Sequence, residues 1–189
     1  MFEKVIFLDI DGVLNGENSK SCYITEDGRT CSGIDKDKVQ RLATIVEATG
    51  ADLVLSSSWK EDWFQHCGFL FKEAGLSKHA KYLTKHLYRK GKLVLRDRTP
   101  SSYRGRGYEI KFWLKTHPQT KAWVILDDEI WPDFYKYDEI WRHWVKTDEK
   151  AGLTEEDATA AIQILQGQLI DPIEKTAEEL MKYYNKDKE

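Results

Sequence analysis

Cysteine, proline and long apolar runs are all scarce in this chain. The three cysteines among 189 residues, Cys22, Cys31 and Cys67, are an odd number at no metal-ligand spacing. Neither a disulfide scaffold nor a cysteine-based zinc site is therefore indicated. No apolar stretch of roughly 18 residues occurs, and the first residues lead straight into a strand pattern, which argues against a transmembrane helix and a signal peptide. We expect a reduced, cytoplasmic protein.

Glycine-rich phosphate loops are also missing. No Gly-x-x-x-x-Gly-Lys sequence occurs, which excludes a Walker-type kinase. No internal repeat, low-complexity tract or interdomain linker is visible either. The 189 residues, of which 41% are hydrophobic, are enough for one domain with a proper core. We expect this single domain to span residues 1–184, with a frayed charged tail at residues 185–189.

Positive charge is concentrated in one segment. The whole chain carries a net charge of −3, yet the 38 residues from Lys78 to Lys115 contain twelve Lys or Arg against Asp97 and Glu109, a net of +10. The remainder must then carry −13. A solvated helix face is the ordinary origin of a charge run, but so large a difference favours contact with an anionic partner. Phosphate-rich substrates fit that partner.

Three apolar runs each end on a small polar or acidic residue. Residues 5–8 run into Asp9, residues 53–55 into Ser56, and residues 124–126 into Asp127-Asp128. Short apolar runs bounded by turn signals are typical of buried strands in a parallel sheet. Because ligands of open α/β sheets bind at the carboxyl ends of the strands, we expect these distant residues to converge on one acidic site.

Strand and helix patterns alternate along the chain, which predicts βαβ units and a three-layer, Rossmannoid α/β fold with a parallel sheet and helices on both faces. The polar stretch 16–34, with Asp27-Gly28 as a turn signal, predicts a small β-flap, and residues 57–105 a basic helical insert. Strands are expected over about 4–9, 51–56, 121–126 and 141–145, with another beginning near 91. Helices are expected over about 36–49, 59–74, 78–89, 107–116, 154–165 and 172–184, the first, second and fifth capped by Asp35, Ser58 and Thr154.

The run Asp9-Ile10-Asp11-Gly12 is the strongest motif. Side chains alternate along a strand, so carboxylates at i and i+2 can lie on the same side, and Gly12 allows the backbone to turn sharply behind them. Mg²⁺ prefers oxygen ligands, and Asp127 and Asp128 can supply further carboxylates from another strand. A single acid in such a place is often only a turn or cap residue, but two acidic pairs directly after apolar strands favour a metal site.

These residues resemble the motifs of the haloacid dehalogenase-like (HAD) superfamily of phosphohydrolases. Asp9-Ile10-Asp11-Gly12 is similar to its first motif, Ser56 to its second and Asp127-Asp128 to its fourth, in the right order over roughly residues 4–148. One branch is resembled more closely, the HAD domain of "Swiss army knife" RNA-repair proteins and related stand-alone proteins, through residues 55–59, 106–110 and 113–114. The resemblance implies a HAD-like fold and phosphatase chemistry.

The resemblance also implies a role for each residue. Asp9 would be the nucleophile that forms an aspartyl-phosphate, and Asp11 the general acid and then the general base. Mg²⁺ would be held by Asp9, by Asp127 and by the Asp11 carbonyl, with Asp128 holding a water of the metal or a basic side chain. Ser56 would hydrogen-bond a phosphoryl oxygen, unless its hydroxyl only satisfies backbone groups. The further residues expected to bind substrate are Ser57, Gly12 and Arg104.

The third family motif, a basic residue near a helix start, has two candidates. Arg106 lies just before the predicted helix, where a guanidinium can reach a phosphate with two hydrogen bonds. Lys111 is the family's usual residue type, but it lies over a turn into the helix. Arg106 is favoured, and either residue could instead be a solvated surface cation.

The function that we predict is a Mg²⁺-dependent phosphatase that hydrolyses phosphomonoesters at a nucleotide or polynucleotide end. The segments between the motifs are short for the large cap domain of many HAD phosphatases, and an open site suits a large substrate such as RNA or DNA. The basic segment could track a phosphate backbone, and Trp131, Trp141 and Trp144 could stack bases unless they pack in the core. The alternatives are a small-metabolite phosphatase or phosphotransferase, and a catalytically idle nucleic-acid-binding module, which would have no use for four acids around a metal.

Overall fold

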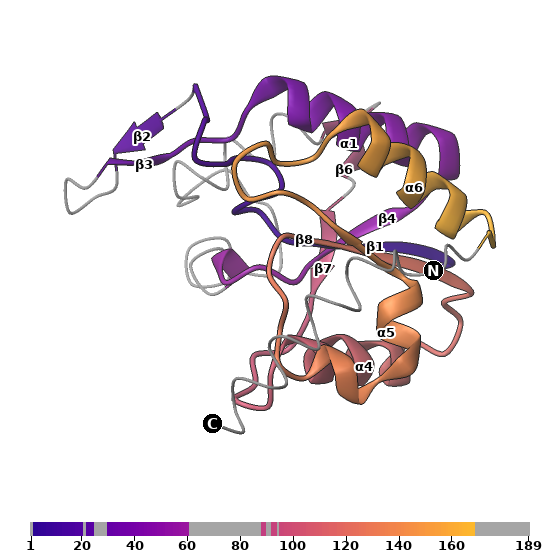
Figure 1. Cartoon of the computed structure of the whole chain (residues 1–189). Helices are drawn as coiled ribbons and strands as arrows, with labels where there is room; N and C mark the ends of the chain where they lie inside the picture. Colours follow the sequence, from indigo (N-terminus) through magenta and orange to yellow (C-terminus); the bar gives the residue numbers. More distant parts are fainter. Residues whose placement is uncertain are drawn as a thin grey trace.

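Five parallel strands form the centre of the computed structural model, which describes residues 2–20, 22–24, 30–60, 88–89, 92–93 and 95–168. The sheet order is β7-β4-β1-β8-β9. Helices α1 and α6 cover one face of the sheet, and α4 and α5 cover the other (Figure 1). The predicted three-layer Rossmannoid α/β fold is therefore confirmed. The strands are β1 (Lys4–Leu8), β4 (Asp52–Leu55), β7 (Leu95–Arg98), β8 (Ala122–Asp127) and β9 (Trp144–Lys146), and the helices α1 (Lys36–Thr49), α4 (Arg106–Thr116), α5 (Asp138–Arg142) and α6 (Glu155–Leu165).

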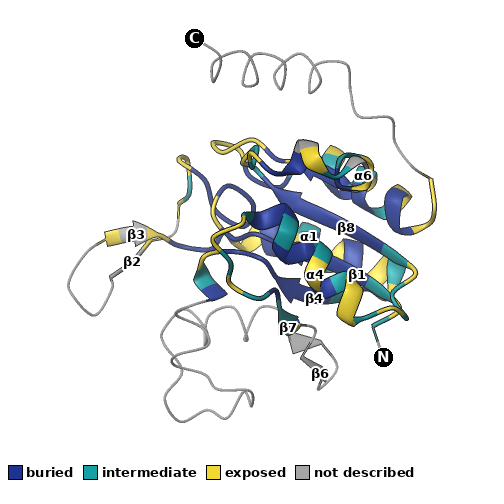
Figure 2. Ribbon diagram, turned by 90° about the horizontal axis from the view of Figure 1, so that it is seen from below, coloured by how far each residue is buried: buried dark blue, intermediate teal, exposed yellow. Residues whose placement is uncertain are grey.

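Side-chain alternation along the strands divides the core into two halves. On β1, Ile6 and Leu8 belong to the cluster under α1 and α6, whereas Val5 and Phe7 belong to the cluster with α4 and α5. All four side chains are fully buried, because helices cover both faces of the sheet (Figure 2). This two-sided burial explains why the strands appear in the sequence as continuous apolar runs.

The strand order places a topological switch point at the end of β1. The chain passes from β1 through α1 to β4 and then β7 on one side, and returns to β8 and β9 on the other side. The register aligns Leu8 with Leu55 of β4 and with Leu126 of β8. The residues that follow these three strands therefore meet at one edge, where open α/β sheets bind ligands.

The helix ends follow the predicted signals with small changes. Gly50 ends α1 in the left-handed region with φ of 72°, and Thr154 forms a capping box with Asp157 at the start of α6. Asp35 occupies the N-cap of α1, but its carboxylate accepts hydrogen bonds from Ser19 and from buried Lys38 instead of capping the helix. The loop before α1 is thus tied to the helix through side chains.

Two short antiparallel hairpins accompany the main sheet. Strands β2 (Cys22–Ile24) and β3 (Thr30–Ser32) pair within the stretch predicted as a flap and project away from the sheet (Figure 1). Strands β5 (Tyr88–Arg89) and β6 (Lys92–Leu93) pair within the predicted insert. Cys22 is a free, exposed cysteine. The Asp27-Gly28 turn, most of the insert and the predicted helix 172–184 lie outside the described residues, so the domain limits stay a prediction.

Two local expectations were wrong. The strand expected over 141–145 begins only at Trp144, because Trp141 belongs to α5 and packs edge-on against the Trp144 ring at 5.7 Å. Tyr88–Arg89 is a strand and not the end of a helix. In both cases aromatic residues, which suit both strands and packed helices, made the pattern ambiguous. The Ser58 cap stays a prediction, because the helix that it would begin lies mostly outside the described residues.

Within the described ranges, no helix combines the length and the apolar character needed to cross a membrane.

His143, in the turn between α5 and β9, is a partly buried histidine held by packing and by a backbone contact. Its ring stacks on Trp123 with centroids 3.9 Å apart, and its Nδ1 lies 2.8 Å from the Glu139 carbonyl oxygen. Burial, together with the charge of Arg142, lowers the pKa of His143 from 6.5 to about 4. The folded state therefore favours the neutral ring.

We expect His143 to make the protein less stable as the pH falls from 6.5 to about 4. In this range the unfolded chain binds a proton that the folded chain does not, so the contribution is complete above pH 6.5 and is lost below it. The loss should be about 1–2 kcal/mol, given the partial solvent exposure of the ring. Urea unfolding of wild type and His143→Gln at several pH values measures it. An unchanged pH slope in His143→Gln would contradict the assignment.

Candidate active site

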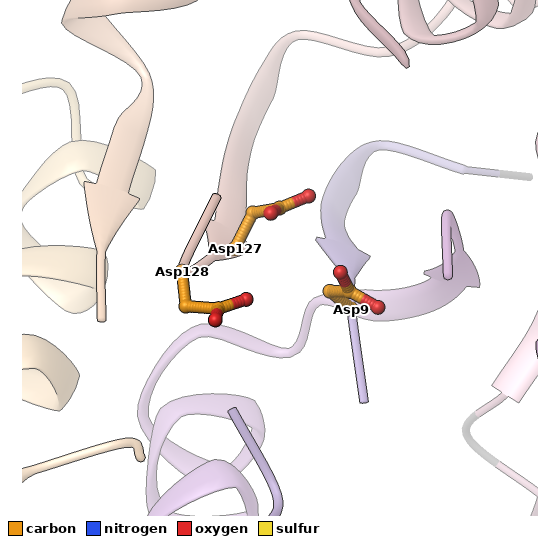
Figure 3. Close-up of side chains that lie close together, drawn as sticks. All are labelled: Asp9, Asp127 and Asp128. Atoms are coloured by element: carbon orange, nitrogen blue, oxygen red, sulfur yellow. The ribbon is translucent and has the colours of Figure 1, made fainter. Parts of the chain in front are cut away.

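Three carboxylates meet at the carboxyl edge of the sheet. Asp9 follows β1, Asp127 ends β8, and Asp128 follows it (Figure 3). Oxygen atoms of the three side chains lie within 4.8 Å of one another. A backbone hydrogen bond from the Asp9 N–H to the Leu126 carbonyl, at 2.9 Å, extends the β1–β8 pairing into the site and holds the carboxylates together. The predicted convergence of residues from distant segments is present in the fold.

The three acids are crowded and poorly solvated. Asp9 and Asp127 are buried, and Asp128 is half-buried. Burial and the charge of Asp9 raise the pKa of Asp127 well above its ordinary value, and the same two causes raise the pKa of Asp128 to about 6. The three carboxylates therefore favour positive charge beside them.

Arg106 supplies part of that charge. Its Nη1 lies 2.8 Å from Asp127 Oδ2 and 3.2 Å from Asp9 Oδ2, and its guanidinium lies over the Trp131 ring, 4.5 Å from the centroid. Burial opposes the charge of Arg106, but attraction to Asp127, Asp9 and Glu109 raises its pKa. Its position at the start of α4 allows the side chain to reach the acids.

Lys111 is directed elsewhere. It forms an ion pair with Glu139, and its ammonium lies over the Tyr137 ring, 5.7 Å from the centroid. Of the two candidates for the third motif, the fold therefore brings Arg106 to the acidic cluster, whereas Lys111 binds a carboxylate of α5.

Asp11 has a separate environment from the other acids. Its Oδ1 accepts a hydrogen bond of 2.7 Å from Asn15 Nδ2, and its Oδ2 accepts one of 2.8 Å from Trp59 Nε1. The side chain of Asp11 does not belong to the group of three acids that could hold a metal ion. Coordination through its carbonyl oxygen stays a prediction.

The two serines after β4 differ in their partners. The Ser56 N–H donates to the Leu8 carbonyl at 2.9 Å, which places Ser56 beside Asp9, and its buried Oγ has no hydrogen-bond partner among the described residues. Ser57 is also buried, but its Oγ accepts from the Trp59 N–H at 3.3 Å. A buried hydroxyl without a partner is costly, so Ser56 is suited to bind a ligand oxygen.

Gly12 shapes the site through its backbone. It has φ of +65°, and a Cβ at this position would lie 2.1 Å from Asp128 Cγ. Its carbonyl accepts a 2.7 Å hydrogen bond from Thr147 Oγ1. Any side chain here would displace Asp128, so the glycine is needed for the acidic cluster to form.

Sequence reasoning missed three supporting contacts. Trp59 donates to Asp11, and Trp131 Nε1 donates to Asp127 Oδ1 at 3.3 Å. Buried Lys60 lies with its Nζ 2.5 Å from Glu109 Oε2, which ties the turn after β4 to α4 one turn beyond Arg106. Glu109 and Trp59 fall within the runs that carry the family resemblance, but nothing in the sequence pairs them with these partners.

The proposed base-stacking role of the tryptophans is not favoured by their positions. Trp144 is buried, and its Nε1 donates to the Asp127 carbonyl at 3.0 Å. Trp141 packs against Trp144, and Trp131 covers the Arg106 guanidinium. The indole rings of Trp131 and Trp144 thus contact residues of the acidic site, and Trp141 packs against Trp144. Arg104, by contrast, is exposed on the loop before α4.

A parallel sheet with a switch point and three carboxylates at its edge defines an α/β protein with an acidic, cation-seeking site. The comparison with protein families identifies it further: the chain belongs to the family described as the HAD domain in Swiss Army Knife RNA repair proteins, whose model matches residues 5–158. The match extends from β1 into α6 and includes every site residue described above. No curated protein matches the chain.

The donor set fits a hard divalent cation. Asp9, Asp127 and Asp128 offer only oxygen ligands from a compact group, and burial with the charge of Asp9 raises the pKa values of Asp127 and Asp128. Such a set suits Mg²⁺ better than metals that prefer nitrogen or sulfur.

We expect Mg²⁺ to raise the melting temperature of the wild-type protein, and Asp9→Asn to reduce that rise. A ligand at about a hundred times its dissociation constant stabilises the folded state by about 2.7 kcal/mol. Without Mg²⁺, Asp9→Asn should be more stable than wild type by about 1 kcal/mol, because repulsion of Asp127 and Asp128 decreases.

Thermal unfolding with EDTA and with Mg²⁺ measures both effects. The control is Glu156→Gln, which removes an exposed carboxylate at the start of α6. Glu156 is not one of the three clustered acids, so this variant should respond to Mg²⁺ as wild type does. An equal Mg²⁺ response in Asp9→Asn and wild type would show that the cation binds elsewhere.

Proposed function

We propose that the chain is a Mg²⁺-dependent phosphatase that hydrolyses phosphomonoesters through an aspartyl-phosphate on Asp9, with a nucleotide or polynucleotide end as the substrate. The observation that carries this proposal is the arrangement at the end of β1: a cluster of three acids, a buried guanidinium beside two of them, and an unpartnered serine hydroxyl after the neighbouring strand. Together they provide a nucleophile, anion-binding donors and ligands for a cation.

Asp9 is the group we assign to nucleophilic attack. Its Oδ1 accepts a 2.7 Å hydrogen bond from the Ile10 N–H, which orients the carboxylate, and Arg106 lies beside its Oδ2. A phosphate bound by Arg106 and by the Ser56 hydroxyl would have its phosphorus next to Asp9. Mg²⁺, held by Asp9, Asp127 and Asp128, would neutralise charge between the carboxylate and the phosphate.

Asp11 is the group we assign to proton transfer. It follows Asp9 by two residues, and both its oxygens accept hydrogen bonds, from Asn15 and from Trp59. In the first step it would give a proton to the leaving oxygen, and in the second it would take a proton from the water that attacks the phosphorus of the aspartyl-phosphate. Its separation from the acidic cluster suits this role, because a metal ligand could not exchange protons freely.

A polynucleotide end is supported by the family and by charge. The family contains domains of RNA repair proteins, and the segment Lys78–Lys115 carries a net charge of +10. Arg104 in this segment is exposed and lies only two residues before Arg106. A small-metabolite phosphatase has the same chemistry but would not need this charge.

The first test is release of phosphate by wild type and Asp9→Asn, with Mg²⁺ and with EDTA. The substrates are p-nitrophenyl phosphate, mononucleotides and oligonucleotides with 3′ or 5′ phosphates. We expect Mg²⁺-dependent release that is fastest on oligonucleotide ends and is lost by at least about a thousandfold in Asp9→Asn. Release only from small esters would favour a metabolite phosphatase, and no release from any substrate would favour an idle binding module.

A second test separates the two basic residues. Arg106→Lys should lower kcat/KM by about 10- to 100-fold, because lysine cannot make two parallel hydrogen bonds to a phosphate. Lys111→Ala should change kcat/KM less than about threefold, since Lys111 binds Glu139 on the surface. Steady-state kinetics on p-nitrophenyl phosphate provide the comparison. A larger loss in Lys111→Ala would reverse the assignment of the third motif.

A further inference from the structure

An exposed group of aromatic and basic side chains lies next to the candidate site. Tyr103 is 95% exposed, which is unusual for a large aromatic residue. The Arg104 guanidinium lies over the Tyr103 and Tyr108 rings, 5.9 and 4.9 Å from their centroids. The Tyr108 ring also lies near the ring of Phe112, with centroids 6.2 Å apart, and Phe112 is 45% exposed. We call Tyr103, Arg104 and Tyr108 the aromatic platform.

The backbone below the aromatic platform is held by hydrogen bonds. The Ser102 N–H donates to Glu109 Oε1 at 2.7 Å, and the Arg104 N–H donates to Ser102 Oγ at 3.1 Å. Because the other oxygen of Glu109 binds buried Lys60, the loop is linked to the turn after β4. Tyr103 and Arg104 therefore project from a loop that hydrogen bonds hold in place, and Tyr108 projects from the first turn of α4.

Asp133 holds the junction between this loop and α4. Its Oδ2 accepts a 2.7 Å hydrogen bond from the Tyr108 N–H. Gly105 has φ of +106°, and a Cβ there would lie 2.5 Å from Asp133 Cγ. This close packing sets the direction in which the chain enters α4, and with it the relative positions of Arg104 and Arg106.

The spacing along the chain suits a polymeric substrate. Arg106 reaches the acids with its guanidinium, and Arg104 lies two residues earlier, so their Cα atoms are within about 8 Å of each other. No described carboxylate forms an ion pair with Arg104, whereas Arg96, Arg106 and Lys111 of the same basic segment are all paired. Arg104 is thus available to an external anion.

We propose that the aromatic platform binds the nucleotides that precede the terminal phosphate of a single-stranded polynucleotide. Bases would stack on Tyr103 and Tyr108, and Arg104 would contact a backbone phosphate while the terminal phosphate lies at Arg106 and Ser56. This inference rests on the proposed function. Aromatic side chains with an adjacent guanidinium are a common means of binding single strands without sequence preference. A peptide would offer neither flat bases nor a repeated negative charge.

The test compares substrates of increasing length. Mononucleotides and single-stranded RNA and DNA of two to eight nucleotides, all with the same terminal phosphate, are assayed with wild type, Tyr103→Ala, Tyr103→Phe and Arg104→Gln. We expect Tyr103→Ala to raise KM for the octamers about tenfold more than KM for p-nitrophenyl phosphate, and Tyr103→Phe to retain the wild-type preference. Arg104→Gln should lower the salt dependence of octamer binding by about one ion.

Lys121→Gln is the matched control for charge. Lys121 precedes β8, at the opposite edge of the sheet from the acids, and its side chain is 79% exposed. This variant should match wild type on every substrate. Equal effects of Tyr103→Ala on p-nitrophenyl phosphate and octamers would overturn the platform, as would a greater effect on a phosphopeptide than on the octamers.

Binding to Asp9→Asn separates this proposal from the proposed function. Fluorescence anisotropy of labelled octamers should show weaker binding to Asp9→Asn/Tyr103→Ala than to Asp9→Asn. If wild type lacks phosphatase activity but this difference is present, the platform stands and the phosphatase proposal fails. If wild type hydrolyses small esters but the two variants bind octamers equally, the phosphatase stands and the platform fails.

Discussion

The balance of charge around Arg106 is the constraint on which the candidate site depends. One guanidinium lies beside two buried carboxylates, with a third acid close by. Burial, together with the charge of Asp9, raises the pKa values of Asp127 and Asp128, and the charge of Arg106 only partly offsets this at Asp127. The protein bears this cost only because parallel strands hold the backbones of Asp9 and Asp127 side by side. A divalent cation held by these three carboxylates would offset their mutual repulsion.

Indole groups and a buried ion pair keep this balance in place. The Nε1 atoms of Trp131 and Trp144 bind the side chain and the carbonyl of Asp127, so that Asp127 is fixed at both ends. Lys60 and Glu109 join the turn after β4 to α4, which carries Arg106. Ser56 and Arg106 therefore approach the acidic site from two elements that are linked to each other. Trp131 and Trp144 support the site in a different way, by holding Asp127.

The sequence predicted those site residues whose positions depend only on neighbouring parallel strands. Asp9, Ser56 and Asp127 each follow an apolar run, and parallel strands in register bring such residues together whatever the intervening loops do. Arg106 could be preferred to Lys111 because it lies at the start of a helix. The contacts of Trp59 with Asp11, and of Lys60 with Glu109, span 48 and 49 residues and depend on loop geometry that local patterns do not encode. Trp141 was misassigned because its packing against Trp144, and not strand propensity, decides its conformation.

The surroundings of the acidic edge bear on the size of the proposed substrate. The described flap is a hairpin of three-residue strands that projects away from the sheet. The proposed polynucleotide would also contact surfaces next to the carboxyl edge of the sheet. The loop before α4 is ordered by Glu109 and Asp133, yet it leaves Tyr103 and Arg104 exposed. The exposed Tyr103 ring adds little to folding, because it stays in water. In the proposed complex a base would cover this ring while the terminal phosphate of the same strand lies at Asp9, so the ring would be buried only on binding.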